Sequence, residues 1–229
     1  MIDRLVINGC SYMDHYVRGN GHADLANLLG INQIRDLSES GASNDRIIRT
    51  TFEDSLIANP SLYVLGTTFF LRQELSLSTR GDHWESVKLG SRVNYLPPHV
   101  SQTDVQNYIK LGLKFNQDTM DAHVELLFYR LIMLIDSLQS RGHKVLVFNT
   151  AEKAIFNTSF CDRKLFKDRT EIIDSLCWLS IPYQFEKGAR YLKQDEQLDP
   201  NLRHVAPGEH KQLNNFLLDY IKKESILHI

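Results

Sequence analysis

The sequence has no long apolar run, and no stretch reaches the roughly 20 residues that a membrane-spanning helix needs. The apolar run after residues 1–4 is also too short for a signal peptide. Only three cysteines occur, without CxxC spacing and in an odd number, so no disulfide framework is indicated. Unpaired thiols favour a reducing compartment. We therefore expect a cytoplasmic protein that does not contact a membrane.

No charge of one sign dominates, because 26 Lys and Arg stand against 28 Asp and Glu, which leaves a formal net charge of −2 at pH 7. Without a basic field, nothing holds the phosphates of a nucleic acid, and we expect no nucleic-acid partner. No internal repeat, low-complexity tract or domain linker is evident. The 42% hydrophobic and 24% charged residues are typical of globular proteins, so residues 1–229 are expected to form a single domain.

Short apolar runs alternate with stretches of helical spacing along the chain. The runs at 5–7 and 62–66 predict buried strands, and the stretches at 33–37 and 144–149 predict a second and a fourth strand. The first three strands each lead into small residues. Helices are predicted over 22–30, from a cap at Ser43 or Asn44 to residue 59, and over 120–138, 168–179 and 210–222, with a short edge strand at 181–185. The polar residues 12–21, with two glycines, predict a loop. This alternation predicts a doubly wound parallel sheet.

The stretch at about 72–118 breaks this rhythm, with scattered aromatic residues, glycines and prolines and little periodicity. Because it follows the end of a strand, it is expected to lie above a site at that edge of the sheet. An insertion that acts as a lid and a few short helices remain alternatives. At its start, Arg72 and Glu74 either contact a substrate or form an exposed ion pair.

Ser11 directly follows the first predicted strand, after Gly9 and Cys10. The carboxyl edge of a parallel sheet is where α/β proteins bind ligands, so this hydroxyl is a candidate nucleophile. A candidate base, His204, lies near the other end of the chain. A serine and a histidine from distant parts of a chain are a possible nucleophile and base.

In chain order, four short stretches resemble the sequence blocks of the SGNH (GDSL-type) hydrolases. Gly9-Cys10-Ser11 matches the Gly-Asp-Ser of block one, and Gly41 matches the glycine of block two. The Gly-x-Asn-Asp of block three falls on Gly66–Phe69. The Asp-x-x-His of block five falls on Asn201–His204, followed by Gly208 and His210. The resemblance spans the whole chain and implies a flavodoxin-like three-layer α/β/α sandwich.

The resemblance also implies roles for individual residues. Ser11 corresponds to the nucleophile and His204 to the general base. The backbone N–H groups of Ser11 and Gly41 correspond to donors that stabilise the oxyanion, and Thr68 stands where the family has the donor Asn. Asn44, from the same segment as Gly41, and Arg72 are further candidates for binding the substrate.

In block five, this sequence lacks the Asp that orients the catalytic histidine in the family. Asn201 stands where the family has Asp. Three alternatives follow: the nearby Asp199 orients His204, Asn201 orients the ring without supplying charge, or Ser11 and His204 act as a dyad. Because Asn201 and Thr68 both depart from the family, a non-catalytic binding module with this fold remains an alternative.

The expected activity is hydrolysis of an ester or another acyl–oxygen bond in a small molecule or a glycan. The implied chemistry needs no organic cofactor and no metal. The metal-ligand types Asp14, His15, His22 and Asp24 occur close together but without a recognised ligand spacing. Acyl transfer to a hydroxyl acceptor is a second alternative, and the sequence does not indicate the oligomeric state.

Overall fold

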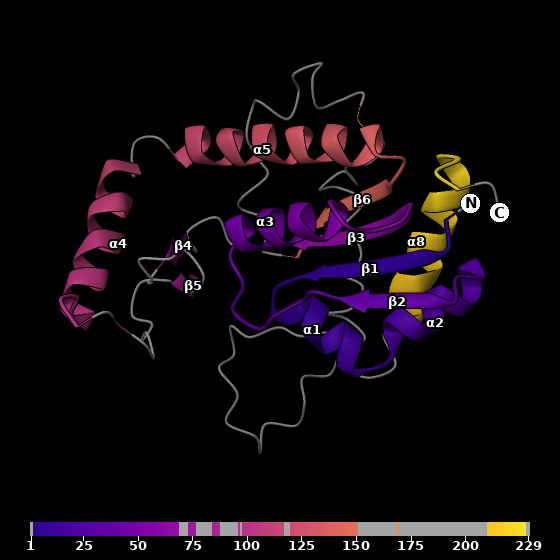
Figure 1. The fold of residues 1–229 in the computed structure, drawn as a ribbon, viewed down its shortest axis with the longest axis horizontal. Helices are drawn as coiled ribbons and strands as arrows, with labels where there is room; N and C mark the ends of the chain where they lie inside the picture. Colours follow the sequence, from indigo (N-terminus) through magenta and orange to yellow (C-terminus); the bar gives the residue numbers. More distant parts are fainter. Residues whose placement is uncertain are drawn as a thin grey trace.

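The main sheet has four parallel strands (Figure 1). The computed structural model describes residues 2–68, 73–76, 84–87, 96, 98–116, 120–150, 169 and 210–227. The strands are β1 (Arg4–Gly9), β2 (Gln33–Asp36), β3 (Ser61–Thr67) and β6 (Lys144–Asn149), in the order β2-β1-β3-β6. This order places β1 inside the sheet, as in flavodoxin-like folds. The predicted parallel sheet is confirmed.

Helices cover both faces of the sheet (Figure 1). The helices α1 (Ser11–Arg18), α2 (Gly21–Leu29) and α8 (His210–Lys223) lie on one face, and α3 (Asn44–Ser55) and α5 (Met120–Ser140) on the other. Successive residues of β1 alternate between the two cores: Leu5 and Ile7 pack with α1, α2 and α8, and Val6 packs with α5. The molecule is the three-layer α/β/α sandwich that the sequence predicted.

Helix α1 forms where the sequence predicted a loop, so that prediction is wrong. Asp14, which is nearly buried, and the exposed Arg18 pair one turn apart along the helix, with 2.9 Å between Arg18 Nη2 and Asp14 Oδ2. Polar residues between the apolar ones hide the helical period in the sequence. The apolar side chains that hold the helix on the sheet are buried: Tyr12, Met13 and Tyr16.

Helix α3 begins at one of its two candidate caps. Ser43 has extended backbone angles, and its hydroxyl accepts the N–H of Arg46 at 3.2 Å. Ile47 is fully buried in the core, whereas Phe52 is 39% exposed and Leu56, at the C-cap, is 50% exposed. The buried face of α3 is therefore narrower than its apolar spacing predicted.

A hairpin and a helix occupy part of the stretch in which the sequence indicated little periodicity. They are β4 (Gln73–Ser76), its antiparallel partner β5 (Trp84–Val87), and α4 (Gln102–Asn116). In Figure 1 they lie at the left, the side toward which the parallel strands point. The role of this part of the chain as a lid stays a prediction.

The hairpin is tied to α3 through Arg49. Two nitrogens of the Arg49 guanidinium donate to the Glu74 carboxylate at 3.0 and 2.7 Å, and the same guanidinium lies 5.1 Å from the centre of the Trp84 ring. The Glu74 side chain is only 3% exposed. The Glu74 side chain is thus a nearly buried partner of α3. Its pairing with Arg72, which lies outside the described residues, stays a prediction.

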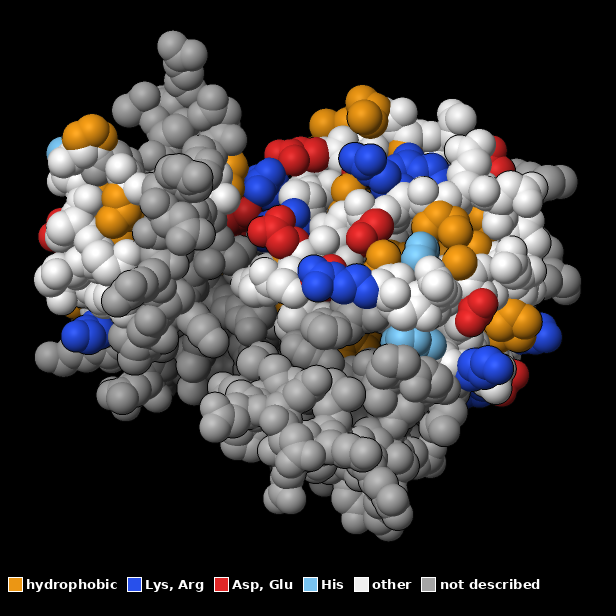
Figure 2. All heavy atoms as spheres, turned by 90° about the horizontal axis from the view of Figure 1, so that it is seen from below, with side chains coloured by type: hydrophobic (Ala, Val, Ile, Leu, Met, Phe, Trp, Pro, Cys, Tyr) orange, Lys and Arg blue, Asp and Glu red, His pale blue; other side chains and the backbone are white. Residues whose placement is uncertain are grey.

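The predicted helix at 168–179 and edge strand at 181–185 lie outside the described residues, apart from Arg169, which pairs with Asp136 of α5 at 2.7 Å. Figure 2 shows acidic and basic side chains interspersed on the face seen from below, as the balanced composition predicts. Of the helices that the structure describes, none combines the length and apolar character that crossing a bilayer requires.

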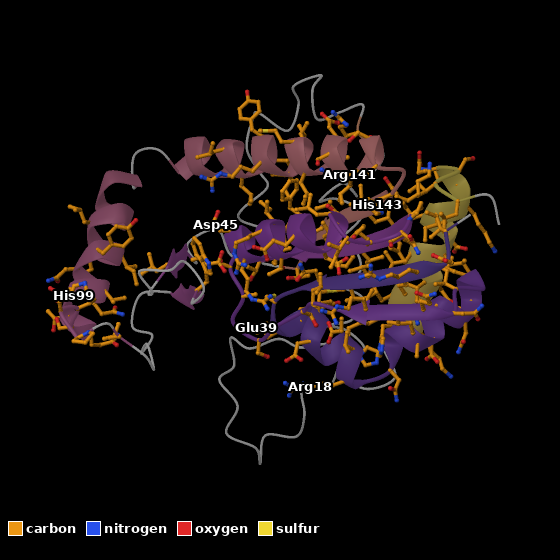
Figure 3. All side chains as sticks on the ribbon, in the orientation of Figure 1. Arg18, Glu39, Asp45, His99, Arg141 and His143 are labelled. Atoms are coloured by element: carbon orange, nitrogen blue, oxygen red, sulfur yellow. The ribbon has the colours of Figure 1, made fainter. Side chains whose placement is uncertain are left out.

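His143 is a buried histidine just before β6, at the amino end of the sheet (Figure 3). Its Nδ1 accepts the backbone N–H of Ser61 at 3.1 Å, so the ring is neutral with its proton on Nε2, 3.4 Å from the Ser55 carbonyl oxygen. Burial lowers the pKa of His143, and the Arg141 and Arg4 charges act in the same direction. The Ser55 carbonyl and Asp54 oppose this shift but do not reverse it.

We predict that His143 makes the fold less stable at acidic pH. As the pH falls below 6.5, the unfolded chain protonates His143 before the folded chain does, so the free energy of unfolding decreases, by at most about 1.4 kcal/mol per pH unit. His143→Asn keeps an acceptor for Ser61 but cannot titrate. Urea denaturation at pH 7.5 and pH 5.5 should show a smaller loss of stability in the variant than in the wild type.

The comparison uses the change with pH, because the smaller Asn side chain also lowers stability at every pH. Burial also lowers the pKa of His22, but His22 is present in both proteins and cancels in the difference. An identical pH dependence of the two proteins would contradict the assignment.

Candidate active site

Ser11 is the first residue of α1 and lies at the carboxyl end of β1. The Cys10 carbonyl accepts the N–H of Asp14 at 3.0 Å and so begins the helical hydrogen-bond pattern. Ser11 is partly exposed, while its neighbours Cys10 and Tyr12 are buried. The first N–H groups of a helix have no intrahelical acceptor and favour negative charge nearby. The structure therefore places Ser11 at the N-terminal end of a helix, where the helix dipole favours a negative charge.

Two glycines let α1 approach the sheet this closely. Gly9 of β1 and Gly66 of β3 are direct partners in the parallel register. A Cβ on Gly66 would lie 2.6 Å from Met13 Cγ, and a Cβ on Gly9 would overlap the same side chain. Met13 thus fills the space above both glycines, and this contact sets the position of the helix that begins with Ser11.

The loop that carries Gly41 lies alongside the end of β1. After β2 the chain continues to pair with β1: Leu37 N–H donates to the Ile7 carbonyl at 2.8 Å, and Glu39 N–H to the Gly9 carbonyl at 3.0 Å. Gly41 has φ +89°, in the left-handed region that glycine adopts without strain. A Cβ there would meet nothing within 4 Å, so the backbone conformation, and not crowding, requires glycine at this position.

Asn44 and Thr68 form a reciprocal contact between α3 and the end of β3. Asn44 Nδ2 donates to the Thr68 carbonyl, and Thr68 N–H donates to Asn44 Oδ1, both at 2.8 Å. The two residues are 4% and 2% exposed. The amide of Asn44 therefore holds the backbone of Thr68 in place. The sequence nominated both residues separately but does not indicate that they contact each other.

Cys10 points toward the end of β6 and is only 5% exposed. Its Sγ lies 3.3 Å from Thr150 Oγ1, and this hydroxyl donates to the Thr67 carbonyl at 2.6 Å. Cys10, which stands at the position of the block-one Asp, thus connects the carboxyl ends of β1, β6 and β3 through Thr150.

Asn8 is a buried residue of this site that the sequence did not single out. Its Oδ1 accepts the Gly9 N–H at 2.8 Å, and its Nδ2 lies 2.9 Å from Thr51 Oγ1 and 3.1 Å from the Ile47 carbonyl. It connects the end of β1 to α3. An amide side chain between an apolar strand and a glycine is the signal that could have indicated it.

The remaining candidates are Arg72, Asp199, Asn201 and His204, and they lie outside the described residues. Their roles stay predictions. Among the residues that the structure describes, no group of three His, Cys, Asp or Glu side chains could hold a metal ion. Asp14, a ligand type noted in the sequence, instead binds Ser40 and Arg18.

No protein-family model matches this chain, and no curated protein sequence matches it. The chain is similar to the solved structure of the protein YXIM from Bacillus subtilis, with a TM-score of 0.53, 11% identity, and coverage of 100% of this chain. It spans 58% of that protein.

Two further solved structures are similar over nearly their whole length. One is a GDSL-like lipase from Bacteroides thetaiotaomicron, with a TM-score of 0.45, 12% identity, and coverage of 97% of this chain and 89% of that one. The other is TesA, with a TM-score of 0.46, 12% identity, and coverage of 98% of this chain and 99% of that one. The parallel sheet with helices on both faces is an α/β fold that this chain shares with the YXIM structure, and at such low identity the likeness shows the fold alone.

We predict that Asn44→Ala lowers the free energy of unfolding by about 2 kcal/mol, because it leaves a buried N–H and a buried carbonyl of Thr68 without their present partner. Chemical denaturation of the variant measures the loss. Asn27→Ala, at an exposed position of α2, is the matched control and should change stability by less than about 0.5 kcal/mol. Equal stability of Asn44→Ala and wild type would show that the reciprocal contact contributes nothing.

Proposed function

We propose that this protein is a serine hydrolase that cleaves an ester or another acyl–oxygen bond, with Ser11 as nucleophile and His204 as general base. The observation that carries the proposal is the placement of Ser11 at the start of α1, beside the Gly41 loop, at the carboxyl edge of the sheet. Hydrolases of this type need a nucleophile and preset donors at one point, and these two elements supply both.

The position of α8 supports the role of His204. The buried ring of His210, at the start of α8, packs edge-on against Tyr16 of α1 with 5.6 Å between ring centroids. Tyr16 Oη donates to Asn214 Oδ1 at 2.5 Å and fastens the two helices together. His204 precedes His210 by six residues. Tyr16 lies five residues after Ser11 in α1, about 8 Å along the helix axis. Six residues span at most about 20 Å, so a place beside Ser11 is within reach of His204.

In the proposed reaction, Ser11 Oγ attacks the carbonyl carbon as His204 accepts its proton. The backbone N–H groups of Ser11 and Gly41 stabilise the oxyanion, with Thr68 as a third candidate donor. His204 then protonates the leaving alkoxide as the carbon–oxygen bond breaks, which leaves an acyl group on Ser11. A water molecule, deprotonated by His204, releases the acid and restores Ser11.

We predict that a fluorophosphonate probe labels the wild-type protein and does not label Ser11→Ala, because the probe forms its covalent bond with an activated serine oxygen. His204→Ala should lower the turnover of a p-nitrophenyl ester of a short acid by roughly 10² to 10⁴-fold, the usual contribution of a general base. Mass spectrometry of the labelled peptide and initial-rate assays measure the two effects.

Cys10→Ala is the control for the neighbouring thiol and should keep the label, because the thiol faces Thr150. Equal labelling of wild type and Ser11→Ala would remove Ser11 from the mechanism. A folded wild-type protein that takes no label would favour the non-catalytic binding module.

A further inference from the structure

A carboxylate on the helix of Ser11 holds the loop of Gly41. Ser40, the residue before Gly41, donates its hydroxyl to Asp14 Oδ2 at 2.5 Å. Asp14 lies on the same face of α1 as Ser11, one turn further along, and is only 8% exposed. The contact joins two segments 26 residues apart, and each of them carries one of the two proposed backbone donors.

The Asp14 carboxylate is also held from its other side. Arg18 Nε lies 3.0 Å from Asp14 Oδ1, and Arg18 Nη2 lies 2.9 Å from Oδ2. Arg18 itself is largely exposed (Figure 3). A nearly buried carboxylate with two partners keeps one orientation, and a hydrogen bond to a charged acceptor is stronger than one between neutral groups. Ser40 therefore binds a charged acceptor that Arg18 also holds.

Other contacts hold the earlier part of the loop. Glu39 N–H is bound to the Gly9 carbonyl, and Arg46 of α3 donates to the Leu37 carbonyl at 2.9 Å and pairs with Glu39 at 2.5 Å. These contacts fix the loop against β1 and α3. The Ser40 contact is different in kind, because it ties the residue next to Gly41 to the helix that carries the nucleophile.

We propose that Asp14, acting through Ser40, is a positioning residue that sets the Gly41 N–H relative to Ser11 for binding the oxyanion. This inference rests on the proposed function, because it assigns a role to Asp14 in the same reaction. The negative charge on Asp14 does not touch the substrate. Its effect is on the distance between two donors, and a misplacement of about 1 Å in such a site can cost a hundredfold in rate.

Ser40→Ala is the direct test, because Ser40 is exposed and its loss leaves the core intact. Turnover of a p-nitrophenyl ester should fall about 10- to 100-fold in kcat with KM unchanged, since the interaction serves the transition state. Fluorophosphonate labelling of Ser11 should slow to a similar extent. Ser40→Thr, which keeps a hydroxyl, should restore most of both rates.

Asp14→Ala should show the same loss as Ser40→Ala, and the double variant should lose no more than either single one, because both remove one contact. Asp14→Asn keeps an acceptor for Ser40 and should lose less. Ser38→Ala is the matched control: Ser38 also donates to a carboxylate at 2.5 Å, but its partner, Asp36, lies two residues away in the same segment. This control should keep wild-type kcat.

The outcomes separate the two proposals. An active wild type whose kcat is unchanged in Ser40→Ala and Asp14→Ala overturns the role of Asp14 and leaves the proposed function standing. An equal loss of kcat in Ser38→Ala also overturns it, because any change in the loop would then have the same effect. A folded wild type without turnover or label overturns the proposed function and this inference with it.

Discussion

The close approach of α1 to the sheet is the contact on which the candidate site depends. Gly9 and Gly66 are neighbours in the register of two adjacent strands, and Met13 fills the space that their missing side chains leave. Close packing in a protein interior allows no such approach over larger residues. With the helix seated in this way, Ser11 begins α1 directly at the end of an interior strand. This packing therefore determines where the nucleophile of the proposed reaction would be.

The second part of the site is a loop whose geometry is imposed from several sides. Backbone pairing with β1 carries the chain past the end of β2, Arg46 holds the loop from α3, and Asp14 holds it from α1. With these attachments in place, Gly41 adopts a left-handed backbone conformation, which few residues other than glycine adopt without strain. Such a loop is preorganised, which is the property that electrostatic stabilisation of a transition state requires.

Polar side chains also join the sheet to α3 near the same edge. The amides of Asn8 and Asn44 each bind backbone atoms of other segments, and Arg49 binds Glu74 of the hairpin that follows β3. Buried polar groups require hydrogen-bonding partners, so these contacts favour one position of α3 against the sheet. Helix α3 thereby connects the loop of Gly41, the end of β3 and the hairpin.

The interior strands β1 and β3 were predictable because their apolar residues form short buried runs, which can be recognised without knowledge of their neighbours. Strand β2 is exposed throughout, and only its place between two helical stretches indicated it. The start of α3 was predictable for a similar reason, since the Ser43 cap acts within three residues. Helix α1 was not, because its buried Tyr12, Met13 and Tyr16 are interrupted by polar residues that find partners elsewhere. The parallel, flavodoxin-like order of the sheet was expected from the alternation of strands and helices and from the resemblance to a known family.

By itself, then, the sequence determined the four parallel strands, the helices α2, α3, α5 and α8, and the residue types available for chemistry: a serine after a strand, a glycine in a loop, and a late histidine. The tertiary structure decided which of them meet. The contacts of Asn44 with Thr68, 24 residues apart, and of Asp14 with Ser40, 26 residues apart, arise only when the parallel strands come into register. Local conformational preferences act over a few residues, whereas packing of the whole sheet brings these distant residues into contact. No sequence pattern near either residue indicates such a contact.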